Sequence, residues 1–254
     1  MAFRGNVALI TGAGSGMGQL AAKNLANAGA SVAALDVNEA GLAETRAAAP
    51  SIRTFPCDVT SYAAVDDVIA RVERELGAID RVMNAAGVMP VGQLLDQTAE
   101  QVNRVMAINY CGTVNVTQRT LPAMLARGRG DLVQFGSLAG WMPTLRFGAY
   151  DASKFAVVAY SEVLYHENRK RGVRITCVCP PAVATPMFEK MKDGAKSTKF
   201  SPVIAPQAVL DAIERSLEKG ELWCFPRFAT ITLWTRRLIP NAAWWFNHRV
   251  EGTP

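Results

Sequence analysis

Short apolar runs alternate along the chain with longer segments whose apolar positions recur every three or four residues. The short runs are rich in β-branched residues and lack strict alternation, which is typical of strands buried on both faces of a sheet. We predict strands at residues 6–11, 31–36, 52–57, 79–86, 130–137, 173–180 and 221–226. We predict helices at residues 17–28, 39–48, 61–76, 99–127, 150–171 and 206–219. This repeated alternation predicts an α/β fold with a doubly wound, central parallel sheet of about seven strands flanked by helices.

All of these elements lie within residues 1–226, where no linker, internal repeat or low-complexity segment interrupts them. We therefore predict one domain over residues 1–226, followed by a C-terminal extension at residues 227–254. The chain has 254 residues and half of them are apolar, which is enough for one large core. No segment approaches the roughly 20 uninterrupted apolar residues of a membrane span.

The five cysteines and the first residues favour a cytoplasmic protein. The cysteines lack C-x-x-C spacing and are typical of buried, reduced thiols. The start of the sequence enters a predicted strand within six residues and lacks the features of a secretory signal. The net charge of +5 includes no basic run or basic patch with interleaved aromatic residues, so we expect no nucleic-acid partner. We predict no metal site.

After the first predicted strand, the sequence TGAGSGMG at residues 11–18 leads into the first predicted helix. Gly12, Gly16 and Gly18 allow a tight turn, close approach of a ligand to the backbone and close packing of the helix on the strand. The helix N-terminus offers free N–H groups and a positive dipole end to a pyrophosphate. Asp36 ends the second predicted strand, where its carboxylate would accept hydrogen bonds from an adenosine ribose. Together these features predict a dinucleotide-binding site.

The same carboxylate favours NAD over NADP. A 2′-phosphate on the ribose would meet the like charge of Asp36. Neither Ser15 nor Val37 offers a positive charge to offset that repulsion. We therefore predict NAD as the preferred cofactor.

The sequence YDASK places Tyr150 and Lys154 four residues apart, and hence on one face of a predicted helix. Taken alone, this spacing is also compatible with a pair of long side chains that extend along the surface into solvent. The motifs in the rest of the chain decide between the two interpretations.

Seven motifs, in this order, resemble those of the short-chain dehydrogenase/reductase family in its compact branch. They are TGAGSGMG (11–18), CDVT (57–60), NAAG (84–87), IN (108–109), GS (136–137), YDASK (150–154) and PPAVATP (180–186). The resemblance covers roughly residues 4 to 226. It implies a Rossmann-type fold and an NAD-dependent alcohol dehydrogenase or ketone reductase.

The resemblance also implies a catalytic group formed by Asn109, Ser137, Tyr150 and Lys154. Tyr150 would exchange a proton with the substrate oxygen, and Ser137 would hydrogen-bond to that oxygen. Lys154 would hold the nicotinamide ribose and, with the positive nicotinamide ring, would favour the phenolate of Tyr150. Asn109 would anchor a water molecule that passes the proton from Lys154 to solvent. Hydride would move between the nicotinamide and the substrate carbon.

The cofactor contacts that the resemblance implies come from most of the motifs. They are Gly12, Ser15, Gly16, Met17, Gly18, Asp36, Asp58, Val59, Asn84, Gly87, Tyr150, Lys154, Pro180, Val183 and Thr185. The sequence departs from the family pattern at two positions. Ala85 replaces the second asparagine of N-N-A-G. Pro181 replaces a glycine, which fixes φ and deletes an N–H where the backbone passes the nicotinamide.

The substrate is expected beyond the carboxyl ends of the strands. The contacts that we predict there are Ser137, Tyr150, Met89, Phe147 and Met187, and the further apolar candidates are Val91, Leu138, Met142 and Phe188. Each apolar side chain is equally compatible with a place in the core. No pair of arginines is placed to bind a carboxylate or phosphate, but Arg146 and the segment at residues 190–199 leave such a contact open. We expect a small apolar secondary alcohol or ketone, and lipid-like, steroid and acyl-thioester substrates remain open.

Three other functions are less compatible with the sequence. A sugar-nucleotide epimerase or dehydratase of the longer branch has a shorter glycine spacing and a longer chain. An enoyl reductase separates its tyrosine and lysine by more than four residues. An NAD-binding regulatory or scaffold protein on the same fold usually lacks one of the four catalytic residues, and all four are present here.

Two features predict assembly and surface contacts. The helices at 99–127 and 150–171 match the two family helices that pair with a symmetry mate, so we expect a homodimer or homotetramer. In the C-terminal extension, an apolar helix face is predicted at Ile231, Trp234, Leu238, Ala242 and Trp245. Pro240 should kink or divide this helix.

The charge of this extension leaves two interpretations open. Arg236, Arg237 and Arg249 add positive charge beside the tryptophans. This combination is compatible with a protein peripheral to a membrane, with the extension in the interface. It is equally compatible with a face that packs on the domain or on a partner subunit and covers the substrate mouth.

Overall fold

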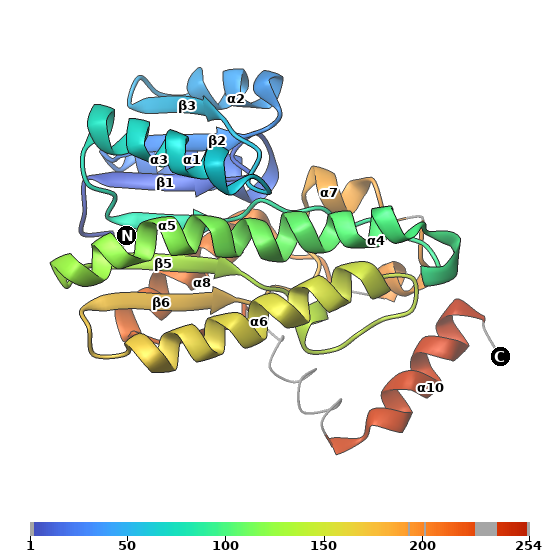
Figure 1. Cartoon of the computed structure of the whole chain (residues 1–254). Helices are drawn as coiled ribbons and strands as arrows, with labels where there is room; N and C mark the ends of the chain where they lie inside the picture. The colour runs from blue at the N-terminus through green and yellow to red at the C-terminus, as the bar shows by residue number, and fades with distance from the viewer. Residues whose placement is uncertain (1–2, 193, 201, 227–237, 253–254) are drawn as a thin grey trace.

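The structure is a computed structural model, which describes residues 3–192, 194–200, 202–226 and 238–252. Its seven strands are all parallel and form one sheet in the order β3-β2-β1-β4-β5-β6-β7 (Figure 1). The strands are β1 (Val7–Thr11), β2 (Ser31–Asp36), β3 (Ile52–Pro56), β4 (Arg81–Asn84), β5 (Gly130–Phe135), β6 (Val173–Val178) and β7 (Trp223–Cys224). The predicted doubly wound α/β fold is confirmed.

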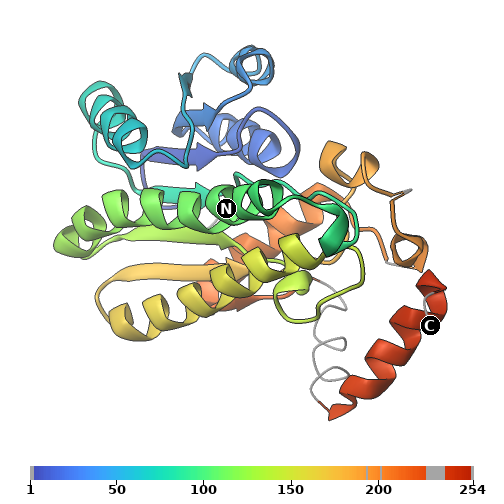
Figure 2. The same cartoon turned by 45° about the vertical axis from the view of Figure 1, so that its right-hand side comes forward.

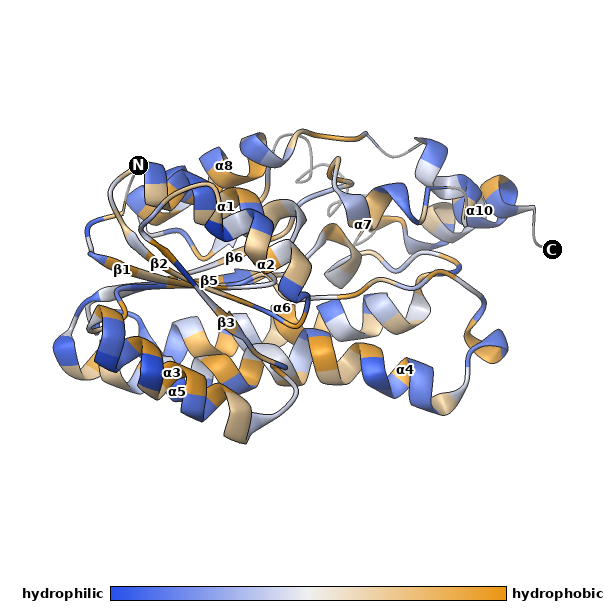
Figure 3. Ribbon diagram, turned by 90° about the horizontal axis from the view of Figure 1, so that it is seen from above, coloured by the Kyte–Doolittle hydropathy of each residue, from blue (hydrophilic) through white to orange (hydrophobic). Residues whose placement is uncertain are grey.

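Helices cover both faces of this sheet (Figure 3). The longer helices are α1 (Gly16–Asn27), α2 (Glu39–Arg46), α3 (Tyr62–Leu76), α4 (Ala99–Met106), α5 (Gly112–Arg127), α6 (Gly148–Asn168), α8 (Pro206–Lys219) and α10 (Pro240–Glu251). Shorter helical segments are η1 (Leu94–Asp96), η2 (Ala107–Cys111), η3 (Leu138–Gly140), α7 (Pro186–Glu189) and η4 (Lys196–Phe200). None of the helices in these described ranges is long and apolar enough to cross a membrane.

Two apolar layers hold the sheet between the helices. Along β1, Ile10 packs toward α1 and α8, whereas its neighbour Leu9 packs toward α3 and α5. This follows from the alternation of side chains along a strand. Both side chains are fully buried, as the β-branched runs in the sequence predicted.

A row of charged residues joins three strands at their amino ends, opposite the edge where the site lies. Asp131 of β5 is in register with Arg81 of β4 and with Arg174 of β6. Its carboxylate accepts from Arg81 Nη2 and from Arg174 Nε, both at 2.7 Å. Arg81 is fully buried and also binds Glu214 of α8. Because breaking a buried pair leaves an unpaired charge, this row stabilises the parallel register.

Two elements differ in detail from the sequence prediction. Residues 99–127 are helical throughout, as predicted, but the π-helical turn η2 lies between the α-helical parts α4 and α5. The strand predicted at residues 221–226 pairs only over β7, because just two residues meet the end of β6 in register.

The C-terminal helix α10 lies beyond the carboxyl ends of the strands, next to η4 (Figures 1 and 2). Pro240 is its first residue. Proline is well tolerated there, because an N–H at the first position of a helix has no partner within the helix. Ile231, Trp234, Arg236 and Arg237 lie outside the described residues, so only the end of the predicted apolar face can be placed.

Two polar residues of α10 face the domain. Asn247 and Glu251, one turn apart, are buried, whereas Trp245 in the same helix and Leu238 just before it are exposed. The Glu251 carboxylate accepts from the backbone N–H groups of Lys196 and Ser197 at 3.2 and 2.7 Å. Arg146 adds an ion pair to Glu251 at 3.4 Å. Helix α10 is therefore attached to the domain by polar contacts, with Trp245 directed outward.

Candidate active site

The Gly-rich loop after β1 packs closely against neighbouring backbone and leaves room for a ligand to approach its own backbone. Gly12 has a φ of 67°, and a Cβ there would lie 2.7 Å from the Ala85 carbonyl oxygen. A Cβ on Gly18 would collide with the carbonyl oxygen of Gly12. Gly16 has a φ of 54°, in the left-handed region that favours glycine.

The first turn of α1 leaves its N–H groups available. Ser15 is the N-cap residue but its side chain makes no capping bond, and the turn, which includes Met17, has no acidic residue. Orphan N–H groups and the helix dipole favour an anion at this position. The loop and helix therefore fit a pyrophosphate.

Asp36, at the end of β2, is held against this loop. Its Oδ2 accepts from the Gly14 N–H at 2.8 Å and its Oδ1 from the Asn38 N–H at 2.9 Å. Gly14 has no room for a side chain, since a Cβ there would lie 2.9 Å from Asp36 Cγ. The neighbouring Ser15 and Val37 are exposed and carry no charge. The carboxylate is fixed, and no cation adjoins it in the sequence.

Three predicted cofactor residues lie farther from the loop centre. Asp58, which follows β3, is exposed. Its Oδ1 accepts hydrogen bonds from the backbone N–H and from the hydroxyl of Thr60, at 2.9 and 2.8 Å. Val59 beside it is buried. The Asn84 amide donates inside the sheet to Thr117 Oγ1 and Gln134 Oε1, at 3.2 and 2.9 Å. Its side chain joins structural elements rather than lining the cavity.

Asn109 lies in the π-helical turn η2 and is fully buried. Its Oδ1 accepts from the Val88 N–H at 2.8 Å, and its Nδ2 donates to the Val88 carbonyl at 2.9 Å. Gly87 provides the space for this contact, since a Cβ there would lie 3.2 Å from Asn109 Oδ1 and 4.0 Å from Lys154 Nζ. Such π turns are frequent at functional sites.

Tyr150 and Lys154 lie one turn apart on α6, both buried, with Lys154 Nζ 5.7 Å from the centre of the Tyr150 ring. They are not a solvent-exposed pair. Lys154 Nζ donates to the Phe135 carbonyl at 2.6 Å, and burial lowers its pKa to about 8. Ser137, after β5, begins η3 and accepts from the Ala139 N–H at 3.1 Å.

The pKa of Tyr150 differs from the expectation. Burial raises the pKa of the phenol to about 12, and a hydrogen bond with Ser137 lowers it only in part. In the protein without bound cofactor, the positive charge of Lys154 does not offset the effect of burial on this pKa. The phenol is therefore neutral at physiological pH, which suits a proton donor.

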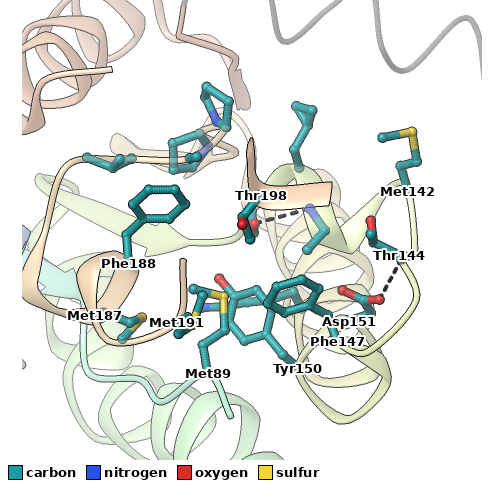
Figure 4. Close-up of a pocket in the computed structure, with 18 of the residues that line it drawn as sticks. Met89, Met142, Thr144, Phe147, Tyr150, Asp151, Met187, Phe188, Met191 and Thr198 are labelled. Atoms are coloured by element: carbon teal, nitrogen blue, oxygen red, sulfur yellow. Dashed lines mark hydrogen bonds between the residues drawn. The ribbon is translucent and has the colours of Figure 1, made fainter. Parts of the chain in front are cut away.

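A cavity of about 410 Å³ adjoins these side chains at the carboxyl edge of the sheet (Figure 4). The predicted residues that line it are Met17, Gly87, Met89, Ser137, Leu138, Met142, Phe147, Tyr150, Lys154, Pro180, Val183, Thr185, Met187 and Phe188. Ala85 and Pro181, the two departures from the family pattern, line it as well. Val91 packs behind Phe147 and Met191 instead.

Thr185 brings the far wall of the cavity close to the Gly-rich loop. It caps α7 by accepting from the Phe188 N–H at 3.4 Å. A Cβ on Gly16 would lie 3.6 Å from Thr185 Cβ. Pro180 accepts from the Leu138 N–H at 3.0 Å, which joins the loops after β5 and β6. The predicted cofactor and substrate residues thus meet around one opening.

Residues 6–196 match the family model described as short chain dehydrogenase. The chain belongs to the short-chain dehydrogenase/reductase family. It is therefore an oxidoreductase of a nicotinamide-dependent family.

Individual proteins of known class are similar to this chain, which supports its place in the family. Retinol dehydrogenase 10-B of Danio rerio is 31% identical over 264 residues, which cover 93% of this chain and 79% of that protein. The 2,3-dihydro-2,3-dihydroxybenzoate dehydrogenase of Bacillus subtilis (strain 168) is 34% identical over 189 residues, which cover 73% and 72%. A short-chain dehydrogenase/reductase from Burkholderia phymatum, solved in complex with NAD, aligns with a TM-score of 0.85 and 26% identity, covering 95% of this chain and 96% of that one.

Several residues that line the cavity of this oxidoreductase were not predicted from the sequence. They are Thr144, Asp151, Met191, Ser197, Thr198, Phe246 and Asn247. The place of Asp151 in the site could have been predicted, because it is a charged residue directly beside Tyr150. The places of Phe246 and Asn247 could not, because periodicity within the extension does not determine which part of the domain it contacts.

Proposed function

We propose that this protein transfers a hydride between NAD(H) and an apolar secondary alcohol or ketone, with Tyr150 as the acid/base. The observation that carries this proposal is the meeting of Ser137, Tyr150 and Lys154 at one end of a largely apolar cavity. Relatives named for retinol and for a dihydrodiol are compatible with an alcohol as the substrate.

The residues present fit a dinucleotide. The uncapped start of α1 would bind the pyrophosphate, Asp36 the adenosine ribose, and the backbone around Asp58 and Val59 the adenine end. Lys154 would bind the nicotinamide ribose, near Thr185 and Pro180. When bound, NAD(H) supplies the hydride or accepts it. Asp36 without a neighbouring cation supports NAD over NADP.

In the reducing direction, the buried phenol of Tyr150 donates its proton to the substrate oxygen. Ser137 hydrogen-bonds to the same oxygen and orients the carbonyl. A neutral phenol suits this step, and its pKa of about 12 keeps the proton on Tyr150 until negative charge develops on that oxygen. In the oxidising direction, the same oxygen atom of Tyr150 accepts the proton of the alcohol.

Lys154 and Asn109 would return the proton to the phenol. With a pKa of about 8, Lys154 exchanges protons near neutrality. Asn109 is held between the loop after β4 and α6, where it would anchor a water molecule that leads to solvent. This role for Asn109 and Lys154 follows from their positions and from the family resemblance.

An NAD-binding regulatory or scaffold protein without turnover is not favoured, because the four residues of the catalytic group are present and lie together. The substrate class rests on the cavity wall, where Met89, Phe147 and Met187 offer apolar surface. We infer a small apolar substrate because polar atoms are few along this wall.

We further propose a cytoplasmic homodimer or homotetramer. On α6, Phe155 and Val163 are exposed apolar residues, which supports a subunit contact on this helix. The outward face of α10 is a second candidate contact, either with a membrane surface or with a partner subunit.

The proposed function is tested with the full chain and a panel of ketones and secondary alcohols. NADH oxidation with apolar ketones, and NAD reduction with the corresponding alcohols, would support it. Absence of turnover in both directions, with NADH binding shown by fluorescence, would contradict it and favour the regulatory alternative.

A further inference from the structure

Asp151 is a carboxyl group inside the substrate cavity that the mechanism above does not use. It follows Tyr150 on α6, is only 2% exposed and lines the same cavity. Its Oδ2 accepts from the Thr144 N–H at 2.8 Å. Among the described residues, its Oδ1 is buried and has no hydrogen-bond partner.

Apolar side chains also lie beside Asp151 in the cavity wall. Figure 4 shows its carboxyl group between Thr144 and the ring of Phe147, on the wall that also carries Met142. Burial raises the pKa of Asp151 to about 7, and the bond from Thr144 lowers it only in part. A buried polar oxygen without a partner is unfavourable, so a ligand group that donates a hydrogen bond to Oδ1 would stabilise this carboxyl.

Two other polar side chains of the cavity are engaged in hydrogen bonds within the chain. Thr198 Oγ1 donates to the carbonyls of Lys192 and Ala195, both at 2.6 Å. Asn247 Nδ2 donates to the Ala243 carbonyl at 3.0 Å. Asp151 is the one carboxylate among the described residues that line the cavity.

We propose that Asp151 binds a second hydroxyl group of the substrate, so that the preferred substrate is an apolar hydroxyketone or diol. This inference rests on the proposed function, which places the reacting carbon at Tyr150. A hydroxyl is favoured over an ammonium group because Lys154 lines the same cavity and would repel a second cation. A hydroxyl donates to an ionised carboxyl and can also bond to a neutral one.

The test uses three matched sets of medium-chain ketones: the parent, a series with one hydroxyl moved along the chain, and the methyl ethers of that series. At pH 8 the carboxyl is mainly ionised and only accepts. We expect one hydroxyketone to exceed its parent and its ether in kcat/KM by about 10- to 100-fold, the range for a hydrogen bond to a charged group.

Two variants assign that preference to the carboxyl. In Asp151→Asn, the amide oxygen keeps the bond from Thr144 and the NH₂ group faces the substrate. The kcat/KM values of the hydroxyketone and its ether should then agree within about threefold, because both oxygens accept a hydrogen bond from the NH₂ group. Asp151→Leu should abolish the advantage over the parent. Asp211→Asn removes the same charge from the exposed surface of α8 and should keep the wild-type preference.

Melting temperature and NADH binding verify that each variant is folded. Equal kcat/KM for parent and hydroxyketones in the wild type, or an advantage that persists in Asp151→Leu, would overturn the inference while leaving ketone reduction intact. A stronger preference for an amino-substituted ketone would also overturn it. Absence of turnover for every ketone would instead contradict the proposed function itself.

Discussion

The side-chain amide of Asn109 donates to the hydroxyl of Ser153 at 2.9 Å and so joins the π-helical turn to α6. Ser153 in turn donates to the Tyr150 carbonyl at 2.7 Å. The buried asparagine is therefore connected to the backbone of the residue that carries the proposed acid. A change at Asn109 would act on the position of Tyr150 as well as on any proton relay.

We expect Asn109→Ala to lower kcat by about 10- to 100-fold, because small displacements of reacting groups have effects of this size. It should also lower stability by about 1–3 kcal/mol, since the Val88 backbone groups lose their partner. The measurements are kcat at saturating substrates and thermal unfolding. The matched control is Asn168→Ala, which removes a buried amide bond to the Leu164 carbonyl at the end of α6 farthest from Tyr150. Equal kcat in the two variants would contradict this account.

The cofactor preference is tested at Asp36. The double variant Asp36→Ala/Val37→Arg should shift the ratio of kcat/KM for NADP over NAD by at least about tenfold, because it removes a repulsive charge and adds an attractive one. Glu39→Ala removes an exposed carboxylate three residues away and should leave the ratio unchanged. Equal or NADP-favouring values in the wild type would refute the assignment.

The sheet was predictable because a strand buried on both faces leaves a clear record in the sequence. The runs that contain Leu9 and Val32 are mostly apolar without strict alternation, and each forms an inner strand. The run that contains Val133 also forms an inner strand, although it includes the buried polar residues Asp131 and Gln134. The π turn within the helix at residues 99–127 was not predictable in this way. A π turn adds one residue without breaking the apolar pattern, and the residue that Asn109 contacts from it, Val88, lies outside the helix.

The site was predictable where family motifs specify it and less so elsewhere. Ser137, Tyr150 and Lys154 meet as their motifs imply. The burial of Asp151 and the contacts of Glu251 depend on how distant segments pack. Periodicity predicted that Leu238 and Trp245 share a helix face, but it does not determine whether that face meets the domain or solvent.

The pKa of Asp151 gives a testable pH dependence of stability. The ordinary value of 3.8 is raised to about 7 by burial, so the folded state holds this proton more tightly than the unfolded chain. Its stabilising contribution is full below pH 4 and is lost as the pH rises to about 7. Lys154, with a pKa of about 8, is mainly protonated in this window, and Tyr150 titrates far above it.

We therefore expect Asp151→Asn to gain stability relative to the wild type as the pH rises from 4 to 7, with no further gain above about pH 8. Urea unfolding of both proteins across this range measures the difference, in which all other titrating groups cancel. A difference that does not change with pH would show that the carboxyl titrates normally.

Exposed apolar side chains at α10 predict an association with another surface. Trp245 of α10 and Leu238 just before it are exposed, and Arg249 lies over the Trp245 ring. We expect Leu238→Ser/Trp245→Ser to abolish either sedimentation with anionic liposomes or assembly seen by light scattering. The inward variant Glu251→Gln should instead raise KM for the ketone, because it weakens the contact with Lys196 and Ser197 beside the cavity.

Both assays are made on the same samples, together with a deletion of residues 228–254. Loss of liposome binding with assembly intact would support a membrane contact. Loss of assembly, with no liposome binding by the full chain, would eliminate the membrane interpretation. An outward double variant that behaves like the wild type in both assays would show that the exposed face binds neither.

The most direct test of the account is the rate of hydride transfer in Tyr150→Phe, measured by NADH absorbance with a ketone that the wild type reduces. The variant keeps the ring but lacks the proton that the substrate oxygen needs. We predict a loss of kcat of about 10²- to 10⁴-fold, the usual contribution of acid–base catalysis, with NADH affinity unchanged within a few-fold. Turnover near the wild-type rate with normal NADH binding would contradict the assignment of Tyr150 as the acid/base.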